Sequence, residues 1–446
     1  MASAPERRKI LWLSDHPLVP SGVGIQAKYV IQGLLETGQY KFTCLGGAIK
    51  HPDYTPQSVA PEVFGENNWI IHPVDGHGNK DQLRRFLAEE KPDALVLFTD
   101  PRFFYWVWEM EDEIRAVCPI VYWHVWDNDP APEYNLPIYE ATDYIMSLSL
   151  KTHGLLQGLK YPADRHSYVP HAEPADLFKP LSDEEIREAR MKFYGPFANR
   201  EFIVMWNNRN ARRKMTGDVL ESFAKFAKKV GKDRVALLMH TSATDQEGQD
   251  IHSVAKRLGI EEQLLLSESR IPPEQLNLMY NCADCVINIS SNEGFGLGTL
   301  EALYAGVPII VNMTGGLQFQ MGDWWCDQTD FSDQDVLTKL SRSRKNTHRW
   351  WGVPVYPAAR NLVGSQQVPY IYDDRVNDQQ VADAIEKVFK MGRKERRRLG
   401  LEARQWATEK FGMQGMISGW DQGISAAISR HAGLRGKMSS ARLAAV

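Results

Sequence analysis

"NEGFGLGTLEALYAGVPIIV", residues 292–311, joins a glycine-rich turn, a short helix and an apolar strand. Its glycines alternate with other residues, and its two glutamates, Glu293 and Glu301, stand eight positions apart. The apolar run CVINIS precedes the stretch, and Gly306 is predicted to end a helix that runs from about 298 to 305. A strand, a loop and a helix in this order place the loop beyond the carboxyl end of a parallel strand, where ligands bind in α/β sheets.

The residue types in this loop suit a ligand that carries both phosphate and hydroxyl groups. Glycines let backbone N–H groups approach a ligand closely, and the N–H groups at a helix start favour anions. Glu293 on the loop and Glu301, predicted in the first helical turn, can accept hydrogen bonds from hydroxyls. A phosphate with several hydroxyls describes a sugar nucleotide. The alternative is a tight turn with solvated glutamates, and the spacing together with the strand–loop–helix context favours the ligand site.

Near-continuous apolar runs separated by helical segments occur in both halves of the chain. Such runs indicate parallel sheets covered on both faces. The rhythm restarts after residues 170–180, so the sequence predicts an α/β fold with two doubly wound, Rossmann-like parallel-sheet domains. The predicted parts are an N-terminal domain over 1–180, a C-terminal domain over 181–412 with an insertion at about 318–369, and a helix over 413–446 that packs back on the N-terminal domain.

Length and composition exclude several classes of protein. The 446 residues favour two domains, and 43% hydrophobic with 24% charged residues fit a globular chain. The net charge of −4 gives no whole-chain sign of nucleic-acid binding. No signal peptide or spanning apolar segment is recognisable, and five cysteines indicate reduced thiols, so a cytoplasmic protein is expected. CADC, residues 282–285, is a lone pair that predicts a helix end followed by a strand in preference to a metal site.

The opening stretch resembles the E-x7-E signature of the family 4 retaining glycosyltransferases, which have the GT-B fold of two domains facing across a cleft. NNRNARRKMTGD carries Arg209 and Lys214 at the family's Arg-x4-Lys spacing, and PSGVG matches its N-terminal glycine loop. VPHAEPADLFKP resembles the interdomain stretch. The chain departs from the family at Ser21, where a glycine pair is common, and at His171 and Ala172, where Asn-Gly is common.

The resemblance implies a donor and a set of residue roles. The donor would be a UDP- or GDP-sugar, used without a metal or a permanently bound cofactor. Arg209 and Lys214 would stabilise the departing diphosphate. Glu301 would bind the ribose, Glu293 the donor sugar, and His124 would touch that sugar. Backbone contacts to the donor are implied for Gly22, Gly24, Phe295, Gly296, Leu297, Gly298 and Thr299. Retention by a front-face route would need no covalent nucleophile, because the departing phosphate can take the acceptor's proton.

WDND, residues 126–129, offers a competing metal motif. Asp127 and Asp129 have the Asp-x-Asp spacing with which the other large glycosyltransferase fold holds a metal. Arg209 and Lys214 can already stabilise the charge of the leaving group. The preferred interpretation of WDND is therefore an acidic loop that contacts the acceptor or is merely solvated.

The composition of the insertion suggests what kind of acceptor the protein uses. The insertion contains no acidic residue from Val336 to Tyr372. Basic residues with interleaved tryptophans suit a polyanion whose bases stack, such as DNA with hydroxymethylated bases. An anionic lipid or phosphorylated glycan is a second candidate, and a helical hairpin with a solvated basic face and buried tryptophans is the structural alternative. The residues proposed for acceptor binding are Arg342, Arg344, Lys345 and Trp350, with Asp127 and Asp129. A second basic run, GRKERRRLGLEAR, lies on a helix near the C-terminus.

Three function classes therefore compete. A glycosyltransferase acting on a nucleotide sugar leads. A sugar-nucleotide epimerase would need acid–base groups near the sugar, and no convincing pair is visible. A non-catalytic sugar or nucleic-acid binding protein would have no need of the leaving-group clamp that Arg209 and Lys214 form.

Overall fold

The computed structural model describes residues 6–342 and 348–444, and the chain divides into two compact units. The first unit holds the described residues up to 126, Ala131–His171 and those from 413 onward. The second holds Asp127–Pro130 and Ala172–Gly412. Residues 172–180, expected in the N-terminal domain, thus belong to the second unit. So does the short segment Asp127–Pro130, whose polar contacts are described below.

The first unit is built on an eight-stranded sheet with the order β3-β4-β2-β1-β5-β6-β7-β8. Its strands are parallel except for the edge pair β3–β4. The order β4-β2-β1-β5-β6-β7 is the doubly wound arrangement in which strand order reverses beside the first strand. The strands are β1 (Arg8–Asp15), β2 (Tyr40–Gly47), β3 (Gln57–Ser58), β4 (Trp69–Pro73), β5 (Ala94–Phe98), β6 (Ile120–His124), β7 (Tyr144–Ser147) and β8 (His166–Tyr168).

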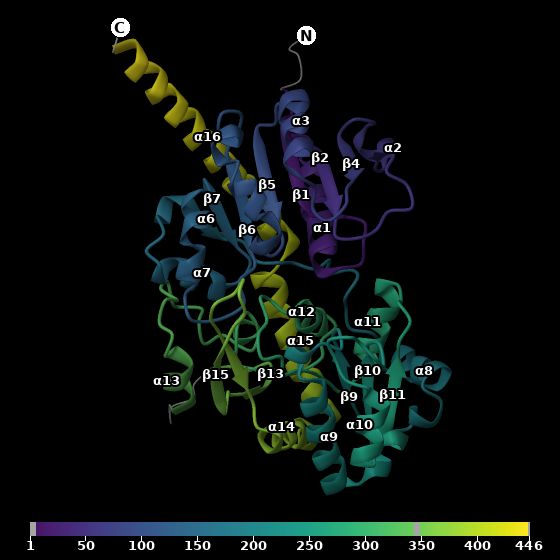
Figure 1. Cartoon of the computed structure of the whole chain (residues 1–446). Helices are drawn as coiled ribbons and strands as arrows, with labels where there is room; N and C mark the ends of the chain where they lie inside the picture. The colour runs from purple at the N-terminus through teal and green to yellow at the C-terminus, as the bar shows by residue number, and fades with distance from the viewer. Residues whose placement is uncertain (1–5, 343–347, 445–446) are drawn as a thin grey trace. The chain divides into compact units, whose positions relative to one another are not determined.

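Helices follow the strands of the first unit as the alternating pattern predicts (Figure 1). They are α1 (Gly22–Glu36), α2 (Pro61–Phe64), α3 (Lys80–Glu90), α4 (Tyr105–Trp108), α5 (Glu111–Arg115), α6 (Leu136–Glu140), α7 (Leu150–Gly158) and α16 (Met413–Ala444). The last of these, α16, packs on α1, β7 and β8 although it comes at the end of the chain. Both faces of β5 and β6 are buried, which is why these strands read as continuous apolar runs.

The second unit has a six-stranded, fully parallel sheet with the order β11-β10-β9-β12-β13-β14. The strand order reverses between β9 and β12, so these neighbours form the switch point where such sheets bind ligands. The strands are β9 (Phe202–Asn207), β10 (Val235–His240), β11 (Leu264–Ser267), β12 (Cys285–Asn288), β13 (Ile309–Asn312) and β14 (Gly352–Val355). The helices are α8 (Asp183–Phe193), α9 (Thr216–Val230), α10 (Ile251–Leu258), α11 (Pro273–Cys282), α12 (Leu297–Tyr304), α13 (Val336–Arg342), α14 (Asp378–Lys390) and α15 (Gly392–Lys410).

The predicted α/β class is confirmed, while the insertion differs from the helical hairpin considered for it. Its described part contains one short helix, α13, and then β14, which extends the parallel sheet. A separate antiparallel pair follows, formed by β15 (Ala359–Val363) and β16 (Ile371–Arg375). Its tryptophans at 324, 325 and 351 are buried, as the structural alternative expected.

Two smaller predictions from the sequence are also confirmed. No disulfide joins the cysteines, all five of which lie in the described part of the chain, and CADC is a helix end followed by a strand: α11 ends at Cys282 and β12 begins at Cys285. Within residues 6–342 and 348–444, no helix is both long and apolar enough to span a membrane.

Candidate functional site

The loops that follow β9 and β12 meet at the switch point of the second unit. The two strands pair directly, so their carboxyl ends bring residues 208–214 and 289–296 together. This places the amino group of Lys214 on the carboxylate of Glu293, residues 79 positions apart in the chain. Arg213 Nη1 lies 3.6 Å from the same carboxylate and donates to the carbonyl of Asn292 at 3.0 Å.

Lys214 and Glu293 are largely buried, the Arg213 side chain is 49% exposed, and the three charges shift one another's pKa. The Lys214 side chain is 9% exposed, and burial lowers its pKa although the Glu293 carboxylate works against this. Burial alone would raise the pKa of Glu293, but Lys214 and Arg213 outweigh it and the pKa is lowered. Burial likewise opposes the charged form of Arg213, but Glu293 and Asp127 raise its pKa. The cluster therefore presents two cations against one loop carboxylate at the switch point.

Arg209 lies in the same loop, but it pairs with Asp245 and not with Glu293. Its Nε and Nη2 donate to the two oxygens of Asp245 at 2.9 and 3.0 Å, and its side chain is 61% exposed. Asp245 raises the pKa of Arg209 through these hydrogen bonds. Arg209 and Lys214 nevertheless line one cavity of about 290 Å³. The other lining residues are Ala211, Arg212, Arg213, Glu247, Asp373 and Arg375.

Glu301 lies in the second turn of α12, one turn later than predicted, and takes part in a buried chain of hydrogen bonds. Its carboxylate accepts from the Tyr280 hydroxyl at 2.6 Å, and that hydroxyl accepts from Asn207 Nδ2 at 2.7 Å. Burial raises the pKa of Glu301 to about 7, even though the hydrogen bond from Tyr280 favours the carboxylate. A carboxyl group that titrates near neutrality is suited to exchange its tyrosine partner for a ligand hydroxyl.

The glycine turn before α12 is held from within the protein. Gly296 adopts φ +96°, a conformation that other residues rarely adopt. Gln320 Nε2 donates to the carbonyls of Phe295 and Gly296, and the buried Thr299 hydroxyl donates to the Gly296 carbonyl. The remaining predicted residues of the turn, Leu297 and Gly298, are partly exposed. The backbone contacts predicted for this turn thus have a preformed scaffold.

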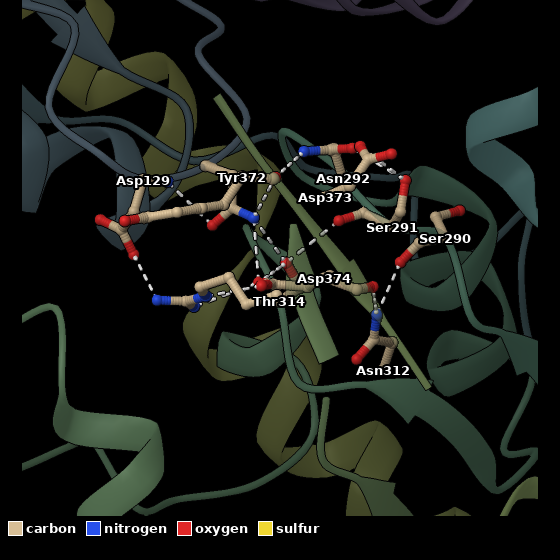
Figure 2. A network of polar contacts seen from close by, with 11 residues as sticks. Asp129, Ser290, Ser291, Asn292, Asn312, Thr314, Tyr372, Asp373 and Asp374 are labelled. Carbon is tan, nitrogen blue, oxygen red and sulfur yellow. Dashed lines mark hydrogen bonds and ion pairs between the residues drawn. The ribbon is translucent and has the colours of Figure 1, made fainter. Parts of the chain in front are cut away.

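A polar network lies directly beneath this loop and holds the carboxyl ends of β12 and β13 (Figure 2). At its centre is Asp374, which is 0% exposed and accepts from Asn128 Nδ2 at 2.9 Å and from the Thr314 hydroxyl at 2.7 Å. Arg360 Nε donates to the same carboxylate at 2.7 Å. Asn292, the residue before Glu293, donates to the Tyr372 carbonyl. The β15–β16 pair is thereby fastened to the loop that carries Glu293.

The two WDND aspartates have different surroundings. Asp129 is 1% exposed and lies 3.9 Å from Arg360, so it is a structural residue in this arrangement and is closed to an acceptor. Asp127 is partly exposed, and its charge acts on Arg213. In the described residues, no group of three or more His, Cys, Asp or Glu side chains is placed to share a metal ion.

In the first unit, His124 is in the core and not at a surface that could meet a sugar. It is fully buried at the end of β6, its Nε2 lies 2.8 Å from the Tyr139 hydroxyl, and burial lowers its pKa to about 3. The prediction that it touches the donor sugar does not fit this position. Gly22 is exposed at the start of α1, and Gly24 is required by packing, because a Cβ there would lie 2.6 Å from the Val19 carbonyl.

The switch point of the first unit carries a polar cluster that was not predicted from the sequence. Asp15, the last residue of β1, accepts from the Ser21 hydroxyl at 2.8 Å and lies 3.3 Å from His77 Nε2. The His16 and His51 rings lie 5.5 Å apart beside it. Burial, followed by the neighbouring His51, lowers the pKa of His16. The exposed Phe103 ring stacks on His77 with 4.8 Å between ring centres. Hydrogen-bonding groups beside an exposed aromatic ring suit a hydroxylated ligand.

The basic insertion is more neutralised than its sequence suggests. Arg349, Arg360 and Lys339 pair with Glu402, Asp374 and Asp333 respectively, and all three carboxylates lie outside the acid-free stretch. Arg342 is exposed at the end of α13, and Trp350 is partly exposed in a bridge with Gly322. Arg344 and Lys345 lie outside the described residues.

Several site residues escaped sequence reasoning. Arg213 lies in the basic run ARRK, but the Arg-x4-Lys spacing predicted roles only for Arg209 and Lys214. Asn207, Tyr280 and Asp374 come from separate elements, and no local pattern links them to Glu293 or Glu301.

Comparison with known proteins bears on this site directly. The family model described as glycosyl transferases group 1 matches residues 187–331, which include the Lys214, Glu293 and Glu301 positions. The chain is similar to a D-inositol 3-phosphate glycosyltransferase of Corynebacterium jeikeium, 27% identical over 176 residues, 39% of this chain and 41% of the relative. A mannosylfructose-phosphate synthase of Agrobacterium fabrum is 24% identical over 190 residues, 42% of this chain and 41% of the relative. The chain spans about two fifths of the length of these curated relatives.

Solved structures resemble the chain over most of its length. A sucrose-phosphate synthase from Thermosynechococcus elongatus has a TM-score of 0.68 at 16% identity and covers 93% of this chain and 98% of its own. The Anabaena protein HepE, solved in complex with UDP and glucose, has a TM-score of 0.65 at 14% identity, over 94% and 100%. At these identities the likeness concerns the fold, and it confirms the GT-B class expected from the sequence.

Proposed function

We propose that this protein is a retaining glycosyltransferase that takes its sugar from a UDP- or GDP-sugar bound at the switch point of the second unit. The observation that carries the proposal is the contact of the buried Lys214 and the half-exposed Arg213 with Glu293, with Glu301 eight residues further along the same loop and helix. The match of residues 187–331 to group 1 glycosyl transferases supports the same interpretation. HepE, a structural neighbour, was solved with UDP-glucose, which makes this nucleotide sugar the first donor to test.

The roles follow from charge and position. The bond between the sugar's anomeric carbon and the diphosphate oxygen breaks, and a new bond forms to an acceptor hydroxyl oxygen, whose proton passes to the departing diphosphate. Lys214 and Arg213 stabilise the negative charge that grows on the diphosphate. Glu293, held by Lys214, accepts from the sugar hydroxyls, and Glu301 exchanges Tyr280 for the ribose hydroxyls.

Arg209 has a conditional role in this proposal. It is paired with Asp245 and lines the same cavity as Lys214. A diphosphate offers a guanidinium the same paired acceptors as a carboxylate does. Arg209 therefore exchanges Asp245 for the donor when the donor binds.

For the acceptor, we propose a small phosphorylated sugar or polyol that binds in the first unit beside Asp15 and His77. The curated relatives are named for inositol phosphate and mannosylfructose phosphate, and the cluster at the first switch point offers hydrogen bonds and an aromatic face. The nucleic-acid alternative loses its main motivation, because three basic residues of the insertion already have carboxylate partners. Lipid and glycan acceptors are tested beside the sugar phosphates in the transfer assay described next.

The decisive experiment is a transfer assay with labelled UDP-glucose and other UDP- and GDP-sugars, with inositol phosphate, sugar phosphates, lipid, glycan and DNA as acceptors. Release of nucleotide diphosphate together with a new glycosidic product is expected. Donor isomerised without transfer would favour an epimerase, and binding without turnover would favour a non-catalytic protein. We further propose that no metal is needed, so full activity in EDTA is expected, and loss restored by Mn²⁺ or Mg²⁺ would reverse this.

Arg209→Ala is the sharpest variant for this assay, because the side chain is exposed and its loss leaves the core intact. Turnover should fall by about 100-fold or more, since one preorganised charge on a developing anion contributes about that factor. Arg234→Ala is the matched control. Arg234 forms the same forked pair with Glu201 in the same unit, at 2.8 and 3.0 Å, and is predicted to leave turnover unchanged. Equal activity of the two variants would contradict the assignment of Arg209.

A further inference from the structure

A second cavity of the second unit lies at the opposite end of the sheet from the Glu293 loop. It has a volume of about 300 Å³ and borders Asp284, just before β12, and Gly306–Pro308, just before β13. These are the amino ends of the strands, whereas the switch-point loops follow their carboxyl ends. The basic run GRKERRRLGLEAR, which has no part in the proposed transfer reaction, forms the start of α15 and supplies part of the cavity wall.

Four arginines line this cavity. They form two pairs, and the two arginines of each pair bind the same carboxylate. Arg190 and Arg396 both bind Asp284, at 2.9 and 2.7 Å. Asp284 is further fixed by the backbone N–H of Ile203 at 2.9 Å. Arg396 is largely buried, so this part of the wall is built into the core.

The second pair lies nearer the surface. Arg393 and Arg397 both reach Asp183, the first residue of α8, at 2.9 and 3.4 Å. Of the two acidic residues that line the cavity, Asp284 and Glu201, the second pairs with Arg234. Four guanidinium charges therefore face the two carboxylates of Asp284 and Asp183, which leaves an excess of two positive charges around the cavity.

The sequence places this charge where the helix itself does not favour it. The first turns of α15 carry Arg393, Lys394, Arg396 and Arg397, although a helix N-terminus favours negative groups. Glu395 is the acidic residue of that first turn, and it pairs with Arg398, which is not among the residues that line the cavity. The local electrostatic cost is relieved if an anion occupies the cavity.

We propose that this cavity binds a phosphate monoester, the phosphate group of a small phosphorylated metabolite, with Arg393 and Arg397 as its exposed ligands. A phosphate monoester carries close to two negative charges at neutral pH and suits the paired geometry of guanidinium groups. The cavity also borders Gly306, just beyond the end of α12, the helix that carries Glu301. This inference is independent of the proposed transferase function.

The test measures thermal unfolding of the full chain during titration with inorganic phosphate and with glucose 6-phosphate, at ionic strength held constant with NaCl. A saturable rise in Tm is expected, larger for the sugar phosphate if the rest of the cavity contributes and equal for both if the phosphate alone is bound. The double variant Arg393→Gln/Arg397→Gln should weaken the apparent affinity at least about tenfold, because two charge-assisted hydrogen-bond donors are lost.

Two control variants localise the effect. Arg398→Gln removes an exposed arginine of the same helix outside the cavity and should keep the full response, and Arg209→Ala should keep it because the switch-point cavity is not involved. The proposal is overturned if the parent protein shows no saturable response, if the double variant responds like the parent, or if Arg209→Ala abolishes the response.

Discussion

At the scale of single residues, Lys214 and Glu293 form a buried pair in which each charge depends on the other. Lys214→Met leaves the Glu293 carboxylate buried with Arg213 as its nearest remaining cation, 3.6 Å away. The variant should lose about 3 kcal/mol in the free energy of unfolding, since a broken buried pair leaves an uncompensated charge. Adding Glu293→Gln removes that charge and should restore at least half of the loss. Urea unfolding of the two single variants and the double variant measures this coupling, and a double variant as unstable as Lys214→Met would contradict it.

Glu301 gives the site a pH dependence of defined sign. Its pKa is raised from 4.5 to about 7 in the folded chain, so between these values the folded state holds a proton that the unfolded state releases. This contribution to stability is fully present below pH 4.5 and is lost as the pH rises through 7. It amounts to about 3 kcal/mol. Glu301→Gln should flatten this part of the stability profile, which denaturant unfolding at pH 5.0 and 7.5 compares directly. An unchanged slope would mean that another group titrates.

The sequence could identify some of these residues and not others, for a physical reason. Lys214 and Glu293 stand on loops that follow recognisable strands, and Glu301 lies on the helix after the second loop, so their positions and the resemblance to the family motifs located them. The pairing of Arg209 with Asp245 depends on a loop 36 positions away, and the burial of His124 depends on Tyr139. Contacts of that kind arise from tertiary packing and leave no local pattern.

At the scale of elements, the β15–β16 pair is joined by an ion pair in which the Asp374 carboxylate is fully buried and Arg360 is partly exposed. Arg360 donates to Asp374, which has no exposed surface and takes its other hydrogen bonds from Asn128 and Thr314. Arg360→Met should therefore destabilise the protein by about 3–5 kcal/mol. Arg375→Met is the matched control, because its pair with Asp373 on the same hairpin is 3.7 Å long and half exposed, and a surface pair contributes at most about 1 kcal/mol. Denaturant unfolding and amide exchange of residues 359–375 measure both, and equal effects would refute the role of Asp374.

The strands β14 and β15 of the second unit were not predicted from the sequence. Strands such as β9 and β12 are buried on both faces and read as continuous apolar runs, so they were recognisable. β14 contains Pro354 at the edge of its sheet, and β15 is exposed along its whole length. β14 is short and interrupted by its proline although Val353 and Val355 are buried, and β15 has no buried face, so neither has the long apolar run of a central strand.

At the scale of the whole molecule, a net charge of −4 conceals local concentrations of positive charge. Arginines gather at both ends of the second unit's sheet, around the cavity of Arg209 and Arg213 and around that of Arg393 and Arg397. The acid-free stretch, which looked the most basic in sequence, draws its counter-charges from other elements. Runs of one sign are therefore poorer guides to anion sites than the local balance of carboxylates and guanidinium groups.

The path of the chain leads to a last prediction, because α16 follows the final helix of the second unit yet belongs to the first. Trp420 on α16 is fully buried, with its ring 5.0 Å from both the Trp12 and the Trp123 rings. Trp420→Ala should cost the first unit about 3–5 kcal/mol of stability. Because the Lys214 and Glu293 site is built entirely within the second unit, UDP binding measured by calorimetry below the unfolding temperature should be unchanged.

Gln422→Ala, an exposed change on the same helix, serves as the control and should alter neither stability nor binding. Unfolding followed by circular dichroism should show the transition of the first unit at a lower temperature in the Trp420 variant, while UDP still raises the temperature of the transition of the second unit. Loss of UDP binding together with the first transition would show that the two units do not fold separately, and the nucleotide site would then depend on the whole chain.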